Sequence, residues 1–170
     1  RGLERPNGSL VDGPSVCVDY FLEQTGHTTI KDLDAALQHS LFWDAKGPAF
    51  IEPGPSRNLK IISSGRVGLT LKRNLPEMEH YVFQPYRFLS EPRRIRKGKN
   101  LLVLELLRQG LSSAEIRRVT GSPHKTIENY SEKLERGKGS DGGLARFAHR
   151  RWSSDELAEA FGAWCGILHG

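Results

Sequence analysis

Residues 101–134 constrain the fold most strongly, because they carry three short apolar stripes at helical spacing, separated by two turn sequences. Leu102, Leu106 and Leu107 fall on one face of a first helix. Gly110 follows, and glycine often ends a helix because it readily adopts the left-handed conformation. The segment therefore predicts a helix that stops at a sharp turn, with two more helices after it.

The second and third helices have their own boundary signals. Ser112 and Glu115 stand three residues apart, which is the spacing of a capping box at a helix N terminus. This helix should run to about Thr120, because Pro123 disfavours helical geometry in the residue before it. The third helix should begin near His124, with an apolar face made of Ile127, Tyr130 and Leu134. Three helices in this order predict a tri-helical helix-turn-helix, with the third helix in the recognition position.

The same stretch carries a family resemblance. Its central part is Glu105-Leu106-Leu107-Arg108-Gln109-Gly110-Leu111-Ser112-Ser113-Ala114-Glu115-Ile116, and it continues to Lys125-Thr126-Ile127-Glu128-Asn129-Tyr130. Residues 102–134 resemble, without a gap, the DNA-binding module of LuxR/NarL-type bacterial regulators, and region 4 of sigma factors has a related pattern. The resemblance covers about a fifth of the chain. It implies a helix-turn-helix whose third helix enters the major groove of DNA.

Several residues depart from the family's pattern. Arg117 stands where alanine is usual, and Thr120 and Ser122 replace leucine and isoleucine. Glu128 and Glu132 occupy positions where relatives often carry lysine toward the DNA. These acidic residues leave open a second interpretation, in which the module is a compact helical packing or protein-interaction element.

The charge of the chain is concentrated around this module. Residues 87–151 hold sixteen Lys or Arg and seven Asp or Glu, a net of +9, whereas residues 1–86 carry −1 and residues 152–170 carry −3. A basic region that overlaps a DNA-binding pattern is the footprint expected for phosphate contacts. We expect these contacts from Arg93, Arg94, Arg96, Lys97, Lys99, Arg117 and Arg118.

Base recognition is expected from the exposed face of the third helix. Asn129 suits adenine, Lys125 suits guanine, and Glu128 could accept a hydrogen bond from a cytosine amino group. The full set of expected base contacts is His124, Lys125, Thr126, Glu128, Asn129 and Glu132.

The N-terminal half has weaker signals, which predict an α+β domain. Two helices followed by a hairpin is the order of a winged helix-turn-helix, with Arg66 as a wing residue. The alternative is a small assembly or control domain without a nucleic-acid role. We expect an extended or poorly ordered arm with two glycine-rich turns over 1–15, and helices over 16–24 and 30–42, the latter capped by Thr28 or Thr29. A hairpin of 59–62 with 67–71 and a third strand over 81–83 should follow.

The C-terminal segments give two pairs of alternatives. Arg146 and Arg150, close to Phe147 and Trp152, suit phosphate contact and base stacking but could equally attach the tail to the body. The last helix should start at Ser153 or Ser154, and its apolar stripe must pack either on its own chain or on a second copy. We expect self-association through Leu157, Phe161, Trp164 and Leu168, since symmetric DNA-binding modules usually act as dimers.

Together these signals predict an α+β fold class: N-terminal helices with a β-hairpin or small sheet, then a mainly helical half containing the helix-turn-helix and a terminal amphipathic helix. The expected divisions are an α+β domain over 1–86, a basic linker over 87–99, the helix-turn-helix over 100–136, a glycine-rich basic linker over 137–152 and the last helix over 153–170.

No signal for catalysis, a metal or a cofactor is present in the sequence. The six histidines are scattered, and none forms a closely spaced metal-binding pair. Cys17 and Cys165 lack metal-type spacing, and we expect two buried thiols in a reducing cytoplasm. No apolar run approaches the roughly 20 residues needed to span a bilayer, and no secretory signal is visible. These features predict a cytoplasmic protein that is not an enzyme.

The function expected from the sequence is sequence-specific binding of double-stranded DNA by a homodimeric bacterial or mobile-element transcriptional regulator. Two alternatives stay open. One is a protein-interaction module that acts on RNA polymerase or another regulator. The other is the DNA-recognition subunit of a replication or recombination machine.

Overall fold

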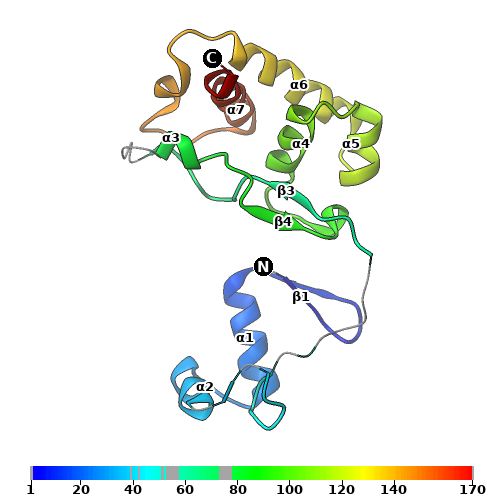
Figure 1. Ribbon diagram of the computed structural model, residues 1–170, viewed down its shortest axis with the longest axis vertical. Coiled ribbons are helices and arrows are strands. Elements are labelled where there is room, and N and C mark those ends of the chain that lie inside the picture. Colours follow the sequence, from blue (N-terminus) through cyan, green and yellow to red (C-terminus); the bar gives the residue numbers. More distant parts are fainter. Residues whose placement is uncertain are drawn as a thin grey trace. The chain divides into compact units, whose positions relative to one another are not determined.

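The computed structural model describes residues 2–38, 40–41, 43–50, 52, 58–72 and 78–169. It has the predicted α+β class, with helices and two small antiparallel sheets (Figure 1). The chain divides into two compact units, residues 1–57 and 58–170. The division therefore lies well before residue 86, where the sequence suggested the end of the first domain.

The first unit begins with a hairpin. The predicted extended arm over 1–15 is wrong here, because Gly8 adopts a φ of +78° and reverses the chain. The Arg5 N–H donates to the Ser9 carbonyl at 2.9 Å, which closes the turn. The elements of this unit are β1 (Gly2–Glu4), which pairs antiparallel with β2 (Leu10–Asp12), then α1 (Pro14–Thr25) and α2 (Ile30–Leu37).

The helices of this unit have shallow burial. Thr29 caps α2 as predicted, and its hydroxyl accepts a hydrogen bond from the Asp32 N–H at 3.1 Å. The helix ends at Leu37, earlier than predicted, and Phe42 lies outside the described residues. Neither α1 nor α2 has a buried residue among those described, whereas Val11 of β2 is buried.

The second unit begins with a two-stranded ribbon that the sequence did not indicate. Strand β3 (Ile62–Ser64) pairs antiparallel with β4 (Arg87–Leu89). The predicted hairpin of 59–62 with 67–71 is wrong, since 67–71 forms turns and the fully buried Leu71 packs in the core.

The predicted strand over 81–83 is also wrong. The short helix α3 (Met78–Tyr81) covers its start, and Val82 and Phe83 are buried among aromatic side chains rather than paired in a sheet. Burial alone satisfies these apolar residues, so their β-forming character does not decide their conformation.

Helix α4 (Lys99–Arg108) lies at the centre of the second unit, between the β3–β4 ribbon and α6 (Figure 1). Two apolar clusters meet on it: Leu102 and Leu106 belong to one, and Leu101 and Leu104 to the other. The remaining elements are the 3₁₀ turns η1 (Pro92–Arg94) and η2 (Gly143–Phe147), with helices α5 (Ser113–Thr120), α6 (His124–Lys138) and α7 (Ser154–His169).

Glu105 is a buried carboxylate on α4, with only 1% of its surface exposed. Arg108 neutralises it through two hydrogen bonds, Nε to Oε2 at 2.9 Å and Nη2 to Oε1 at 2.7 Å. These bonds raise the pKa of Arg108. Gln109 donates a further bond at 2.8 Å, so the buried charge is fully partnered, as burial in an apolar core requires.

Helices α6 and α7 approach each other closely at two glycines. A Cβ at Gly137 would collide with the backbone carbonyl of Glu159, and one at Gly162 would collide with that of Leu134. The glycines therefore permit backbone contact, which buries Phe161 and Trp164 against their own chain. This corrects the prediction that Phe161 and Trp164 mediate self-association. Leu157 is partly buried against the same cluster, and the Leu168 side chain lies outside the described residues.

Candidate nucleic-acid interface

The first turn of the helix-turn-helix forms as predicted. Gly110 has a φ of +78°, and a complete capping box then starts α5. The Ser112 hydroxyl accepts from the Glu115 N–H at 3.3 Å, and the Glu115 carboxylate accepts from the Ser112 N–H at 2.9 Å. The hydrogen bonds from Ser112 lower the pKa of Glu115. The box satisfies two backbone donors at the N terminus of α5.

The second turn explains two departures from the LuxR/NarL-type pattern. Thr120 and Ser122 are buried where the pattern has leucine and isoleucine. The Thr120 hydroxyl donates to the Ile116 carbonyl at 2.8 Å and accepts from the Ser122 N–H at 3.1 Å. Together with Gly121, which has a φ of 70°, these bonds fix the turn that aims α6. Polar bonding replaces apolar packing at this point.

The N terminus of α6 is open. Pro123 is its N-cap residue, and in the described structure no side chain caps it and its first turn carries no acidic residue. The positive end of the helix dipole therefore has no side-chain carboxylate in its first turn, an arrangement that favours anions.

The expected base-contacting residues at this end are accessible. His124, Lys125 and Glu128 are exposed, and Thr126 is half-buried. His124 Nδ1 lies 3.1 Å from Glu128 Oε2, so this carboxylate has a local partner. The structure therefore leaves four of the six expected base-contacting residues accessible at the start of α6, between His124 and Glu128.

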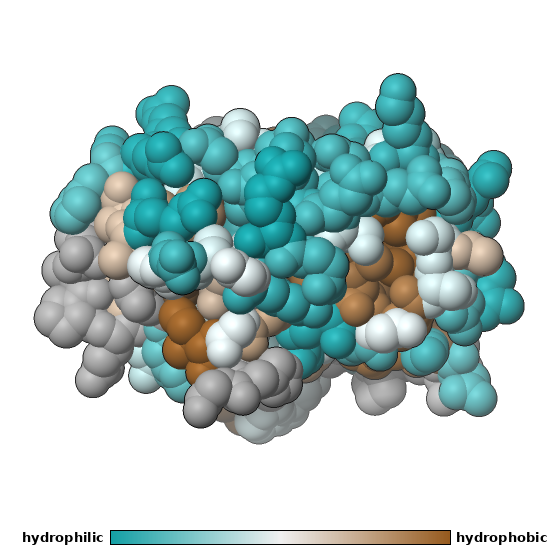
Figure 2. Space-filling view, turned by 90° about the horizontal axis from the view of Figure 1, so that it is seen from above, coloured by the Kyte–Doolittle hydropathy of each residue, from teal (hydrophilic) through white to brown (hydrophobic). Residues whose placement is uncertain are grey.

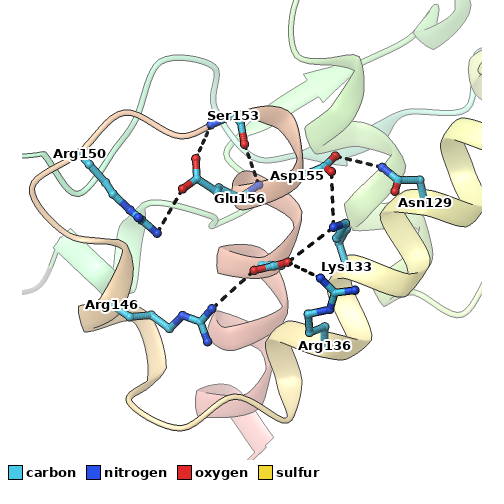
Figure 3. Close-up of polar contacts among 9 residues, drawn as sticks. Asn129, Lys133, Arg136, Arg146, Arg150, Ser153, Asp155 and Glu156 are labelled. Atoms are coloured by element: carbon cyan, nitrogen blue, oxygen red, sulfur yellow. Dashed lines mark hydrogen bonds and ion pairs between the residues drawn. The ribbon is translucent and has the colours of Figure 1, made fainter.

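The C-terminal half of α6 is instead bound to α7 (Figure 3). Asn129 Nδ2 donates to Asp155 Oδ1 at 3.0 Å, and Lys133 Nζ lies 3.5 Å from Asp155 Oδ2. Arg136 Nη1 donates to Glu159 Oε1 at 3.2 Å. The sequence predicted Asn129 as a base contact but gave no indication of its bond to Asp155. The only sequence signal for this contact was charge, since three acidic residues lie in 152–170, directly after the strongly basic segment 87–151.

The predicted basic linker is part of the folded unit and reaches the helix-turn-helix. Turn η1 contacts α5, and a Cβ at Gly121 would lie 3.6 Å from Arg93 Nε. Lys99 Nζ donates to the Arg93 carbonyl at 3.4 Å, and Arg94 Nη1 lies 3.0 Å from Glu91 Oε2. The other expected phosphate contacts are exposed: Arg96, Lys97, Arg117 and Arg118.

The basic and aromatic tail segment is attached to the body. Phe147 is buried, and its carbonyl accepts from Trp152 Nε1 at 2.7 Å. Arg146 lies over the Phe147 ring, 4.8 Å from its centroid, and Arg150 Nη2 lies 3.2 Å from Glu156 Oε1. Of the two sequence interpretations, the structure shows the one in which this segment packs on its own chain.

Figure 2 shows one face of the molecule, most of which is hydrophilic, with two separate hydrophobic areas.

Neither cysteine is an exposed reactive thiol. Burial raises the pKa of the Cys165 thiol to about 11, so the thiol stays protonated and unreactive. Cys17 is half-buried, not buried as predicted.

Within the described ranges, no group of three His, Cys, Asp or Glu residues could hold a metal ion. None of the described helices is long and apolar enough to cross a membrane.

Comparisons with protein-family models, curated proteins and solved structures find no match to this chain.

Proposed function

We propose that residues 99–138 are a DNA-binding helix-turn-helix of the LuxR/NarL type, in a regulator that recognises specific duplex sites. The observation that carries the proposal is the open N terminus of α6, which follows a hydrogen-bonded turn with Arg93 beside it. A major groove admits one helix, and helix-turn-helix proteins insert the N-terminal part of the third one.

Roles follow from the position of each side chain. Lys125 is exposed at the helix start and suits the guanine acceptors, while Thr126 and His124 lie beside it. Arg93, Arg117 and Arg118 belong to the elements that flank α6 and suit phosphate contacts. Asn129 would have to exchange its bond to Asp155 before it could contact adenine.

A fluorescence-anisotropy titration of the full chain against a random-sequence duplex, at low and moderate salt, tests the proposal. Each phosphate contact should contribute a slope of about −0.9 to the plot of log affinity against log salt. We expect measurable affinity at low salt that falls steeply with added salt, followed by selection of a preferred site from a random library. Undetectable binding at low salt would reject the proposal.

A second candidate function is protein recognition by the same helix. Its supporting observation is the exposure of Glu128, Glu132 and Glu135 on α6. Glu128 pairs with His124, and Glu135 Oε1 lies 2.7 Å from Lys138 Nζ. An acidic helix face of this kind would suit a basic protein surface, such as one on RNA polymerase. Tight capture of purified polymerase, together with weak or salt-independent duplex binding, would favour this candidate.

A further inference from the structure

We propose that the outer face of the β3–β4 ribbon binds an unpaired nucleic-acid strand, with Phe88 and Tyr86 stacking on its bases. The inference rests on the proposed function, which supplies nucleic acid as the class of ligand. It assigns a second site, which prefers a single strand to a duplex. Phe88 is 69% exposed, Tyr86 is 54% exposed and Ile61 is 58% exposed. Phe88 thus has the largest exposed fraction among the apolar side chains described.

The ribbon has two chemically different faces. Ile62 pairs with Leu89 in the register, and both side chains pack in the apolar cluster of the helix-turn-helix. Phe88 pairs with Ser63 on the opposite face, because successive side chains of a strand alternate. Tyr86 directly precedes β4 and is also exposed. The inner face holds the ribbon in place while the outer face presents the Phe88 ring next to a small serine.

The charge around the ribbon favours a polyanion. Residues 58–99 contain ten Lys or Arg and three Asp or Glu, a net of +7. Gly98 lies against the side chains of Val67 and Arg87, so the basic segment 96–99 adjoins the end of the ribbon. Aromatic rings for base stacking next to cationic side chains for phosphates are the combination that binds single strands without sequence preference.

The same charge argues against a second copy of this chain as the occupant. Pairing two ribbons would bring two regions of net charge +7 together, and like charges across an interface disfavour association. The path to the helix-turn-helix is also basic. Strand β4 continues into η1, whose Arg93 lies beside Gly121 in the turn before α6. A nucleic acid bound at α6 could therefore extend along η1 to the ribbon. The ribbon would bind one nucleic-acid strand at a point where the two strands of the duplex are separated.

The test uses the full chain in anisotropy titrations with a labelled oligothymidylate, run in parallel with the duplex. We expect Phe88→Ala to weaken oligothymidylate binding on the order of ten-fold, as loss of one stacked base predicts. Phe88→Leu should show a similar loss, because leucine keeps the apolar surface but has no π face, and Phe88→Trp should retain binding. Duplex affinity should change less than about twofold in all three variants. Phe21→Ala is the matched control, since Phe21 is 46% exposed in the first unit.

Several outcomes would overturn the inference. One is unchanged oligothymidylate affinity in folded Phe88→Ala. Another is full rescue by Phe88→Leu together with a Phe88-dependent shift in sedimentation, which would indicate a second copy as the occupant. The two proposals fail separately. Duplex binding with Phe88-independent oligothymidylate binding rejects only the ribbon site. Phe88-dependent oligothymidylate binding without duplex affinity supports the ribbon and rejects the helix-turn-helix function.

Discussion

The two halves of α6 differ in what holds them. Residues 124–128 begin without a side-chain cap, and His124, Lys125 and Glu128 are exposed, with His124 paired to Glu128. From Asn129 onward, the polar side chains toward α7 bond to Asp155 and Glu159, and Gly137 brings the two backbones together. The helix thus has an accessible first half and a second half that is bound to α7 on one side, with Glu132 and Glu135 exposed on the other. The arguments for base contact therefore apply to its first half.

The comparison of the two halves of α6 predicts the largest effect on stability where the backbones of α6 and α7 are in contact. Gly162→Ala should lower the free energy of unfolding by about 2 kcal/mol, since overpacking against Leu134 costs about 3 kcal/mol and alanine's helix propensity returns about 1. Urea denaturation followed by circular dichroism measures it. Gly139→Ala is the control, because a Cβ there meets nothing within 4 Å, and it should stay within about 0.5 kcal/mol of the parent. Equal stability of the two variants would contradict a structural role for the second half.

Substitution of one lysine in each half of α6 tests how much each half contributes to duplex binding. Lys125→Ala should weaken cognate-duplex binding about ten-fold, or about 1.4 kcal/mol, because Lys125 is exposed at the open end. Lys133→Ala should leave binding within about twofold, since Lys133 faces Asp155 and Glu159. Anisotropy with matched duplexes measures both constants. A larger loss from Lys133→Ala than from Lys125→Ala would reverse the assignment of the two halves.

Asn129 lies at the boundary between the halves. The sequence predicted that Asn129→Ala would relax base preference, whereas the bond to Asp155 predicts a coupling of about 0.5 kcal/mol in unfolding free energy. A double-mutant cycle with Asp155→Ala measures that coupling. Selection of preferred DNA sites by the Asn129→Ala variant measures its base preference. A strongly relaxed preference with no coupling would move Asn129 into the accessible half.

The capping boxes of α5 and α7 provide the smallest predicted effect, a dependence of stability on pH. Hydrogen bonds from Ser112 lower the pKa of Glu115, and those from Ser153 lower the pKa of Glu156. Because the folded pKa values lie below the unfolded ones, the unfolded chain binds more protons in acid. The stability from these boxes is therefore complete above the unfolded carboxyl pKa and is lost as pH falls through the folded one.

Urea titrations at a series of acidic pH values measure this effect. The Ser112→Ala, Ser153→Ala double variant should show a shallower loss of stability with falling pH than the parent chain. Ser131→Ala, which changes a half-buried serine on α6 outside both boxes, is the control. Parallel curves for the double variant and the parent would show that the boxes do not contribute.

The elements of the helix-turn-helix were predictable because their signals are local. The box of Ser112 with Glu115, the turn at Gly110 and the start of α6 at His124 all formed where the sequence indicated. Each depends on residues within one helical turn, where spacing decides which groups meet. The cap of Thr29 on α2 and that of Ser153 on α7 followed the same rule.

The candidate site was only half predictable. The sequence predicted that the candidate base-contacting residues lie on one helix, but the partner of Asn129 is 26 positions away on α7. The spacing of residues along the chain contains no information about a pair that forms between two helices. Thr120 and Ser122 replace the leucine and isoleucine of the pattern, and only the structure shows that the Thr120 hydroxyl accepts from the Ser122 N–H across the turn.

By itself, the sequence determined helices α4 to α7, the capping boxes of α5 and α7 and the concentration of basic charge around them, because these depend on neighbours in the chain. The tertiary structure decided that Ile62–Ser64 pairs with Arg87–Leu89, that Phe88 faces outward, and that α7 covers the second half of α6. Those outcomes depend on which apolar surfaces bury each other. Residues distant in sequence compete for the same core, and only the folded chain shows which of them pack there.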